Sequence, residues 1–207
     1  LQLYERKRTN YFVKAVCIVM LKQFYPYAYA ESVFAIDYQK LYDKGYRGIL
    51  FDIDNTLVHH GDPSTKEVDA LFQKLHRMGW KTLLLTNNDQ ERVERFIQNI
   101  HTLYLCDAEK PDPSSYQKAI EQLNLPKQTV ICIGDQIFTD ILGANRSGIA
   151  SILVKFIQID GETKIGKRRY LERLILKFYR HSPFCRDRLG NIYLKEEDTI
   201  CNTNYSA

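Results

Sequence analysis

Between residues 48 and 154 the chain alternates short apolar runs with stretches in which apolar residues recur every three or four positions. Short apolar runs bounded by polar or turn residues are typical of buried strands. The pattern therefore predicts five strands, at residues 48–53, 81–86, 103–105, 129–133 and 151–154.

The segments between these runs have the pattern of amphipathic helices, with the apolar positions on one face. Capping residues predict two of the helix starts. Asn88 has Glu91 three residues later, as in a capping box, and Asp112 precedes Pro113, which suits the first helical position. The predicted helices cover residues 66–78, 88–99, 113–123 and 140–147.

Strands that alternate with helices at this spacing indicate a parallel sheet with helices on both faces. We therefore predict an α/β fold, a three-layer sandwich around a central parallel sheet, for residues 20–160. Residues 1–19 are expected to be an N-terminal extension, whose place in the native protein the sequence leaves open. Residues 161–207 are expected to be a basic amphipathic C-terminal segment.

Polar side chains follow the predicted strands where each strand ends. Ligands bind beyond the carboxyl ends of the strands in an open parallel sheet, so these side chains are expected to share one site. Asp52 and Asp54 are two residues apart and can face the same side. The candidate site residues are Asp52, Asp54, Thr86, Asn87, Lys110, Asp135 and Asp140.

Converging carboxylates repel one another unless a cation lies among them, and oxygen ligands without His or Cys favour Mg²⁺. One carboxylate can then attack phosphorus while another transfers protons. Lys110 can bind phosphoryl oxygens. Each of these motifs taken singly is ordinary turn or loop chemistry. The four motifs in this order, each at a strand end, predict phosphoryl chemistry.

Four segments resemble the motifs of the haloacid dehalogenase (HAD) superfamily: FDIDNTLV, LLLTNN, Lys110-Pro111 and GDQIFTD. The resemblance covers residues 48–154, about half of the chain, and implies a HAD-like Rossmannoid fold. It is strongest to the YqeG-type class III phosphatases, through KGYRGILFDIDNTLV and GDQIFTDILGANRSG. It implies a Mg²⁺-dependent phosphatase.

The resemblance also implies roles for single residues. Asp52 would be the nucleophile and Asp54 the general acid and base. Thr86, Asn87 and Lys110 would bind the phosphoryl group. The metal would be held by Asp52, the backbone carbonyl of Asp54 and Asp135, with Asp140 binding it directly or through water. His59, His60 and His76 are expected to be surface residues without a role in this chemistry.

Residues 58–85 and 87–109 are each filled by one predicted helix and its connections, which leaves no room for a cap domain. An open site suits a phosphate carried on something large. YqeG-type proteins are similar to the mitochondrial enzymes that dephosphorylate phosphatidylglycerophosphate, so a lipid headgroup is the leading substrate. A phosphatase of soluble phosphomonoesters or nucleic-acid ends, and a non-catalytic interaction module, are the alternatives; nucleic acid is not expected as the partner.

The C-terminal segment bears on this choice. Residues 161–190 hold nine Lys or Arg against three acidic residues, a local excess of six positive charges. In residues 168–180 an apolar stripe lies beside basic residues, as in helices that lie in a membrane interface. A helix packed on the domain with its charges in water is the alternative. The stripe consists of Leu171, Leu174, Ile175 and Phe178, and the basic face of Arg169, Arg173 and Lys177.

Composition adds the expected location. Hydrophobic residues make up 44% and charged residues 26%, as in ordinary globular proteins. The five cysteines form no CxxC pair, which indicates reduced thiols. Residues 6–8 and 15–21 have some features of an export signal, but Lys14 and Lys22 interrupt the apolar run. We predict a cytoplasmic protein, with peripheral binding to the inner face of the membrane left open.

Overall fold

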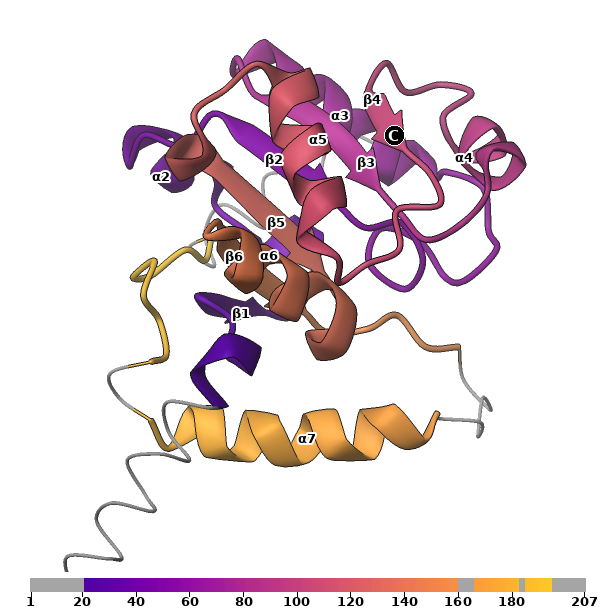
Figure 1. The fold of residues 1–207 in the computed structure, drawn as a ribbon. Coiled ribbons are helices and arrows are strands. Elements are labelled where there is room, and N and C mark those ends of the chain that lie inside the picture. Colours follow the sequence, from indigo (N-terminus) through magenta and orange to yellow (C-terminus); the bar gives the residue numbers. More distant parts are fainter. Residues whose placement is uncertain (1–20, 160–165, 183–184, 195–207) are drawn as a thin grey trace, which may run out of the picture.

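The computed structural model describes residues 21–159, 166–182 and 185–194. A single parallel sheet of six strands forms its centre, in the order β1-β6-β5-β2-β3-β4 (Figure 1). Every residue of the central strands β2 and β5 is buried, because helices cover both faces. The strands are β1 (Ala28–Ala30), β2 (Gly48–Phe51), β3 (Lys81–Leu85), β4 (Leu103–Leu105), β5 (Val130–Gly134) and β6 (Ala150–Val154).

Alternate residues of the strands enter different cores, as the two-residue period of a strand requires. Ile49 and Phe51 of β2 pack with α2, α3 and α4, whereas Leu50 packs on the opposite face with α5 and α6. The predicted three-layer α/β sandwich is confirmed. The helices are α2 (Tyr38–Asp43), α3 (Lys66–Arg77), α4 (Gln90–Phe96), α5 (Pro113–Leu123), α6 (Leu142–Ser147) and α7 (Lys167–Arg180).

The segments between the site motifs contain no inserted domain. Residues 58–85 form a turn, α3 and β3, and residues 87–109 form α4, β4 and their loops. The predicted absence of a cap domain from these two segments is therefore confirmed. The site at the carboxyl ends of the strands is not covered by an additional domain in these two segments.

The predicted boundaries of two helices are wrong. The cap of α4 is Asp89, which accepts a hydrogen bond from the backbone N–H of Arg92, while the side chain of Asn88 is used elsewhere. The helix ends at Phe96, not at residue 99. The helix expected from residue 140 is preceded by the wide, π-type turn η4 (Ile137–Ile141), so that Asp140 lies within this turn. A π-type turn frequently marks a functional site.

The N-terminal described residues complete one edge of the sheet. Ala28 and Ala30 of β1 are buried, and this strand pairs with β6. Residues 1–19, expected to be an extension, lie outside the described residues. The domain boundary at residue 160 stays a prediction. Residues 185–194 lie against the same core, since Ile192 is fully buried and its carbonyl accepts a hydrogen bond from the Asp37 N–H.

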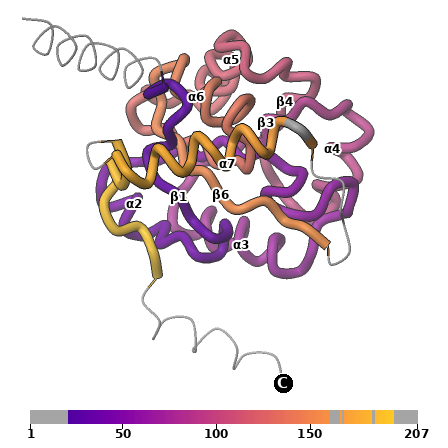
Figure 2. Tube along the Cα trace, turned by 90° about the horizontal axis from the view of Figure 1, so that it is seen from below, coloured from indigo at the N-terminus to yellow at the C-terminus, as the bar shows by residue number. Residues whose placement is uncertain are grey.

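Helix α7 crosses the outside of the molecule beneath β1 and β6 (Figures 1 and 2). Ile175 and Tyr179 pack with Tyr25, Ile137 and Ile141 in a third apolar cluster. Among the described residues, none of the helices has the length and apolar character needed to cross a bilayer.

Candidate active site

The structure brings Asp52, Lys110 and Asp140 together beyond the carboxyl ends of β2 and β5. The Nζ atom of Lys110 lies 2.7 Å from Oδ1 of Asp52 and 2.7 Å from Oδ1 of Asp140. The Lys110 side chain is only 3% exposed, so these ion pairs are screened little by water. Burial lowers the pKa of Lys110, but Asp140 and Asp52 together raise it above its ordinary value, and the ammonium stays charged.

Asp135 joins the same group from the end of β5. Its Oδ1 atom accepts a hydrogen bond of 3.3 Å from the Thr56 hydroxyl, which also donates to Oδ2 of Asp52 at 3.0 Å. Its other carboxylate oxygen pairs with the guanidinium of Arg169, from α7. Arg169 also donates to the backbone carbonyl of Asp135, at 2.7 Å. The C-terminal helix therefore contacts the candidate site directly.

Asp140 is held in place by close packing around η4. Its Oδ2 atom accepts a hydrogen bond from the backbone N–H of Gln136, and the hydroxyl of Tyr116 donates to its backbone carbonyl. A Cβ atom at Gly134 would lie 2.3 Å from Cγ of Asp140. Position 134 therefore requires glycine, because any side chain there would displace the Asp140 carboxylate.

These carboxylates fit a divalent cation. One carboxylate oxygen from each of Asp52, Asp135 and Asp140 lies within 4.8 Å of the others. Burial and the charge of Asp140 raise the pKa of Asp52 to about 6, although Lys110 opposes this. Burial and the charge of Asp52 raise the pKa of Asp135 to about 8. Ionisation of all three carboxylates is thus unfavourable without a further cation, since Lys110 and Arg169 offset their charge only in part, and the oxygen donors suit a hard cation.

Asp54 lies beside this group with a different set of partners. Its Oδ1 atom accepts hydrogen bonds from Arg92 at 2.7 Å and from the Gly61 N–H at 3.2 Å, and its Oδ2 atom accepts one from Asn88 at 2.7 Å. Burial raises the pKa of Asp54, but the hydrogen bonds from Arg92, Gly61 and Asn88 together lower it below its ordinary value. The Asp54 side chain is not part of the three-carboxylate cluster.

The end of β3 supplies three neighbouring polar residues with distinct contacts. Thr86, which is buried, accepts hydrogen bonds from the backbone N–H and the side-chain amide of Asn88. Asn87 accepts a hydrogen bond of 2.7 Å from the Lys110 N–H and donates to the Lys110 carbonyl at 3.3 Å. Asn87 therefore holds the Lys110 backbone, while its predicted contact with phosphate stays a prediction.

Sequence reasoning missed Thr56, Asn88, Arg92 and Arg169. The Arg92 side chain is buried and joins Asp54 to the Asp62 carbonyl. Thr56 is two residues from Asp54 and Asn88 directly follows Asn87, so proximity in sequence was an available signal. Arg169 lies 34 positions beyond Asp135, and only the packing of α7 brings it to the site.

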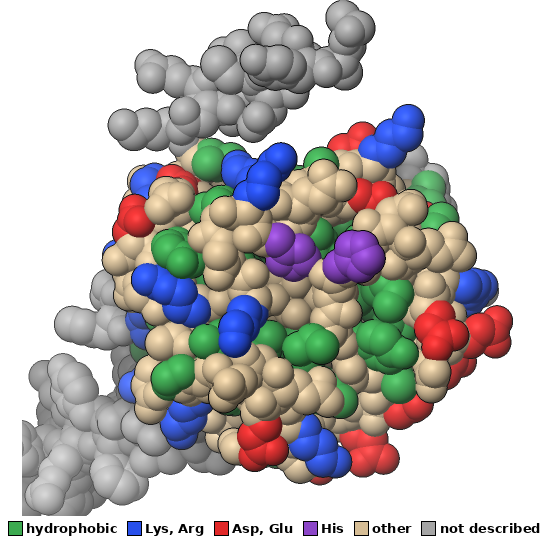
Figure 3. Space-filling view, turned by 90° about the horizontal axis from the view of Figure 1, so that it is seen from above, with side chains coloured by type: hydrophobic (Ala, Val, Ile, Leu, Met, Phe, Trp, Pro, Cys, Tyr) green, Lys and Arg blue, Asp and Glu red, His purple; other side chains and the backbone are tan. Residues whose placement is uncertain are grey.

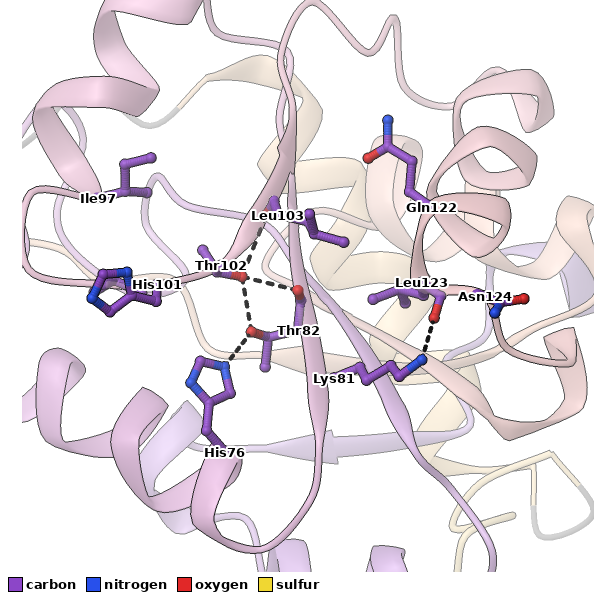
Figure 4. A pocket seen from close by; sticks show the side chains of 11 residues that line it. His76, Lys81, Thr82, Ile97, His101, Thr102, Leu103, Gln122, Leu123 and Asn124 are labelled. Carbon is purple, nitrogen blue, oxygen red and sulfur yellow. Dashed lines mark hydrogen bonds between the residues drawn. The ribbon is translucent and has the colours of Figure 1, made fainter.

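The histidines have different surroundings. His60 is mostly exposed, as expected, yet its Nδ1 atom lies 3.1 Å from Oδ2 of Asp54. His76 and His101 lie at the other end of the sheet, where they line a hollow of about 710 Å³ between α3 and α5 (Figure 4). Figure 3 shows the surface at the C-terminal end of α5, where two histidine side chains lie next to each other. In the hollow, His76 is hydrogen-bonded to Thr82, away from the carboxylates.

Comparison with known proteins identifies the family. Residues 60–148 match the family profile described as haloacid dehalogenase-like hydrolase. The "Probable phosphatase YqeG" of Bacillus subtilis (strain 168) is 33% identical over 159 residues, which cover 76% of this chain and 92% of that protein. The chain belongs to the haloacid dehalogenase-like hydrolases. The predicted superfamily and its assignment to phosphoric monoester hydrolases are thereby confirmed.

More distant relatives of this haloacid dehalogenase-like hydrolase include "Phosphatidylglycerophosphate phosphatase 1, chloroplastic/mitochondrial" of Arabidopsis thaliana. It is 26% identical over 163 residues, covering 73% of this chain and 47% of that protein, so the chain spans less than half of its length. One solved crystal structure has a TM-score of 0.50 at 13% identity and covers 65% of this chain and 85% of that one. This last likeness concerns the fold alone.

Proposed function

We propose that the protein is a Mg²⁺-dependent phosphomonoester hydrolase in which Asp52 carries the phosphoryl group as an aspartyl phosphate. The observation that carries this proposal is the pairing of Asp52 with Lys110 inside a cluster of three buried carboxylates. An interaction module needs no such arrangement, because uncompensated buried carboxylates lower the stability of a fold.

Asp52, Asp135 and Asp140, with the backbone carbonyl of Asp54, would hold the metal ion. When bound, Mg²⁺ would offset the charge of these carboxylates and of the phosphate oxygens. Lys110 would bind a phosphoryl oxygen as a buried point charge, and the hydroxyl of Thr86 would donate a hydrogen bond to another.

In the first step a carboxylate oxygen of Asp52 forms a bond to phosphorus, and the bond from phosphorus to the ester oxygen breaks. The departing oxygen takes a proton from Asp54, which must be protonated at that moment. The hydrogen bonds from Arg92, Gly61 and Asn88 favour the ionised carboxylate. Proton donation by Asp54 therefore works against these contacts, which favour its ionised form.

In the second step water forms a bond to phosphorus and its proton passes to Asp54. The bond between phosphorus and the Asp52 oxygen breaks, which releases inorganic phosphate and the Asp52 carboxylate. The ionised state of Asp54 that its neighbours favour suits this step, because a base must accept the proton.

We propose a phosphorylated lipid headgroup, of the phosphatidylglycerophosphate class, as the substrate. The absence of a cap domain in residues 58–85 and 87–109 supports a large substrate, and the named activity of the Arabidopsis relative agrees with it. A cytoplasmic enzyme at the inner face of the membrane fits this substrate. The described cysteines, Cys106, Cys132 and Cys185, are all free, as in a reducing compartment.

Phosphate release tests this proposal. The substrates are phosphatidylglycerophosphate in mixed micelles, p-nitrophenyl phosphate, a sugar phosphate and a 5′-phosphorylated oligonucleotide, each with Mg²⁺ and with a chelator. We expect Mg²⁺-dependent turnover that is fastest with the lipid. Turnover confined to soluble esters would contradict the lipid substrate alone, whereas no turnover of any ester would contradict the catalytic proposal.

Stabilisation by Mg²⁺ is expected to grow with pH. The raised pKa values of Asp52 and Asp135, about 6 and about 8, mean that the metal-free folded state binds more protons than the unfolded state above pH 4 or so. Its unfolding free energy therefore falls as pH rises toward 8, while Mg²⁺ binds the ionised carboxylates and restores stability. Thermal unfolding with and without Mg²⁺ should show a larger rise in Tm at pH 8 than at pH 5.

The variant Asp135→Asn is the control for this titration. It should lose most of the Mg²⁺-induced rise in Tm at pH 8, since one of the three clustered carboxylates is gone. A rise that is the same at both pH values, or that survives in Asp135→Asn, would show that Mg²⁺ does not bind these groups.

A further inference from the structure

Helix α7 has an inner face that is firmly attached to the domain. Glu172 accepts a hydrogen bond of 2.8 Å from the Ile137 N–H and pairs with Arg169 at 3.0 Å. Arg169 in turn binds Asp135, and Ile175 and Tyr179 are buried in the apolar cluster beneath the helix. These contacts fix which side of α7 faces outward.

The outer face of α7 is apolar. Four large residues, Tyr170, Leu171, Leu174 and Phe178, are between 48% and 61% exposed. These four make up half of the eight exposed large hydrophobic residues in the part of the chain that the structure describes. The predicted apolar stripe is therefore divided, because Ile175 points into the domain and the other three members point outward. A large exposed apolar patch usually marks an interaction site.

Exposed basic residues border the apolar ones along α7. Arg168, Arg173, Lys177 and Arg180 are exposed, and the guanidinium of Arg173 lies 4.9 Å from the ring centre of Tyr170. The only acidic residue in α7, Glu172, is buried on the inner face. The exposed charge of α7 is thus uniformly positive.

We infer that the outer face of α7 is a docking surface for an anionic lipid bilayer. Aromatic and aliphatic side chains with a basic border, and no exposed acidic residue, complement the headgroup region of such a bilayer. Packing of α7 on the domain requires only that the inner residues Ile175 and Tyr179 are buried and that Glu172 keeps its hydrogen bonds. The exposed Leu171, Leu174 and Phe178 are unfavourable in water unless they meet a partner.

The docking surface begins beside the catalytic centre. Arg169 binds Asp135, and the next two residues, Tyr170 and Leu171, are on the outer face. A cavity of about 200 Å³ lies between α7 and β6, and Asp135, Arg169, Arg173 and Arg180 are among the residues that line it. A bilayer held against α7 would therefore bring its headgroups to basic residues close to the candidate metal site. The biological role of this docking surface rests on the proposed lipid phosphatase function, whereas binding to the bilayer does not require phosphate hydrolysis.

Co-sedimentation with vesicles tests the surface. The full chain is mixed with vesicles of phosphatidylcholine alone and of phosphatidylcholine with phosphatidylglycerol. We expect partition onto the anionic vesicles only, and a decrease of about tenfold or more in Leu174→Ser/Phe178→Ser. The matched control is Leu103→Ser, an equally exposed leucine on β4, which should bind like the wild type.

Charge is tested in the same way. Lys177→Glu should lower partition onto anionic vesicles about fivefold or more, whereas Lys118→Glu, exposed on α5, should leave it unchanged. Hydrolysis of p-nitrophenyl phosphate is measured in parallel. All four variants should retain the wild-type rate, because none of these residues contacts the site.

The outcomes separate the two proposals. Binding without any turnover would overturn the proposed function and leave the docking surface standing. Turnover without binding to anionic vesicles, or equal binding by Leu174→Ser/Phe178→Ser, would overturn the docking surface. If the same double variant instead converts a dimer into a monomer in light scattering without a change in vesicle binding, the surface holds a second copy of the chain, and the inference is wrong.

Discussion

Replacing Asp52 with asparagine is expected to lower Mg²⁺-dependent phosphate release by about 10³-fold or more. An amide cannot attack phosphorus, so the aspartyl phosphate cannot form. The fold should survive, because the amide oxygen can still accept a hydrogen bond from Lys110, while the amide NH2 can donate to the Thr56 hydroxyl, which donates in turn to Asp135. Burial makes the ionised Asp52 costly, as its pKa of about 6 shows, and the neutral amide removes this cost. At pH 8 and without metal, Asp52→Asn should therefore be at least as stable as the wild type.

Steady-state assays and thermal unfolding measure both effects. The matched control is Asp43→Asn, which changes an exposed aspartate of α2 whose side chain accepts a hydrogen bond from Gln39, and this variant should be fully active. If Asp52→Asn keeps the wild-type rate, Asp52 is not the nucleophile. If it is inactive and unfolded, the more conservative Asp52→Glu separates folding from chemistry, because it keeps the carboxylate and misplaces it.

Replacing Lys110 with methionine is expected to affect both stability and turnover. The ammonium is buried between Asp52 and Asp140, at 2.7 Å from each, and its removal leaves two carboxylates without their cation. Breaking a buried ion pair in this way costs about 3–5 kcal/mol of unfolding free energy. Turnover should fall by about 10²-fold or more, since no charge remains there to bind the phosphoryl oxygens.

Urea denaturation with and without Mg²⁺ measures this prediction. Mg²⁺ should restore part of the lost stability in Lys110→Met, because it binds the same carboxylates. The control Lys118→Met removes an exposed lysine of α5 and should change the unfolding free energy by less than about 0.5 kcal/mol. A loss below about 1 kcal/mol in Lys110→Met, with turnover retained, would contradict the arrangement around Asp52.

The strands and most of the helices could be predicted because local signals agreed with the final packing. Val68, Leu71, Phe72 and Leu75 are all buried on the inner face of α3, as their spacing indicated. Asp112 and Pro113 begin α5 as expected. The start of α4 could not be predicted from sequence, because Asn88 and Asp89 are both good helix caps. In the structure the Asn88 side chain donates hydrogen bonds to Asp54 and Thr86, so Asp89 caps the helix instead.

The candidate site could be predicted as far as the parallel sheet determines it. Strand ends on one edge bring Asp52 and Asp135 together, and Lys110 follows from the motif order. The π-type turn that holds Asp140 has no local sequence signal, since it depends on the close packing of Gly134. The contacts of Arg92 with Asp54 and of Arg169 with Asp135 depend on tertiary packing of α4 and α7.

The orientation of α7 shows the same limit of sequence patterns. Periodicity grouped Ile175 with Leu171, Leu174 and Phe178 as one stripe. In the structure the inner face is defined by the hydrogen bonds of Glu172 and by the burial of Ile175 and Tyr179. Ile175 follows Glu172 by three residues, and Tyr179 follows Ile175 by four. A single charged residue buried through a specific hydrogen bond thus rotates the helix away from the orientation that hydrophobicity alone predicts.

The central claim is that Asp52 carries the phosphoryl group. Acid quenching during turnover with Mg²⁺, followed by borohydride reduction and peptide mass spectrometry, tests it, because an acyl phosphate is reduced to an alcohol. The account predicts that residue 52 is converted to homoserine in the wild type, and that this conversion is absent without substrate and in Asp52→Asn. Conversion of another carboxylate, or active turnover with no reducible acyl phosphate at any position, would contradict it.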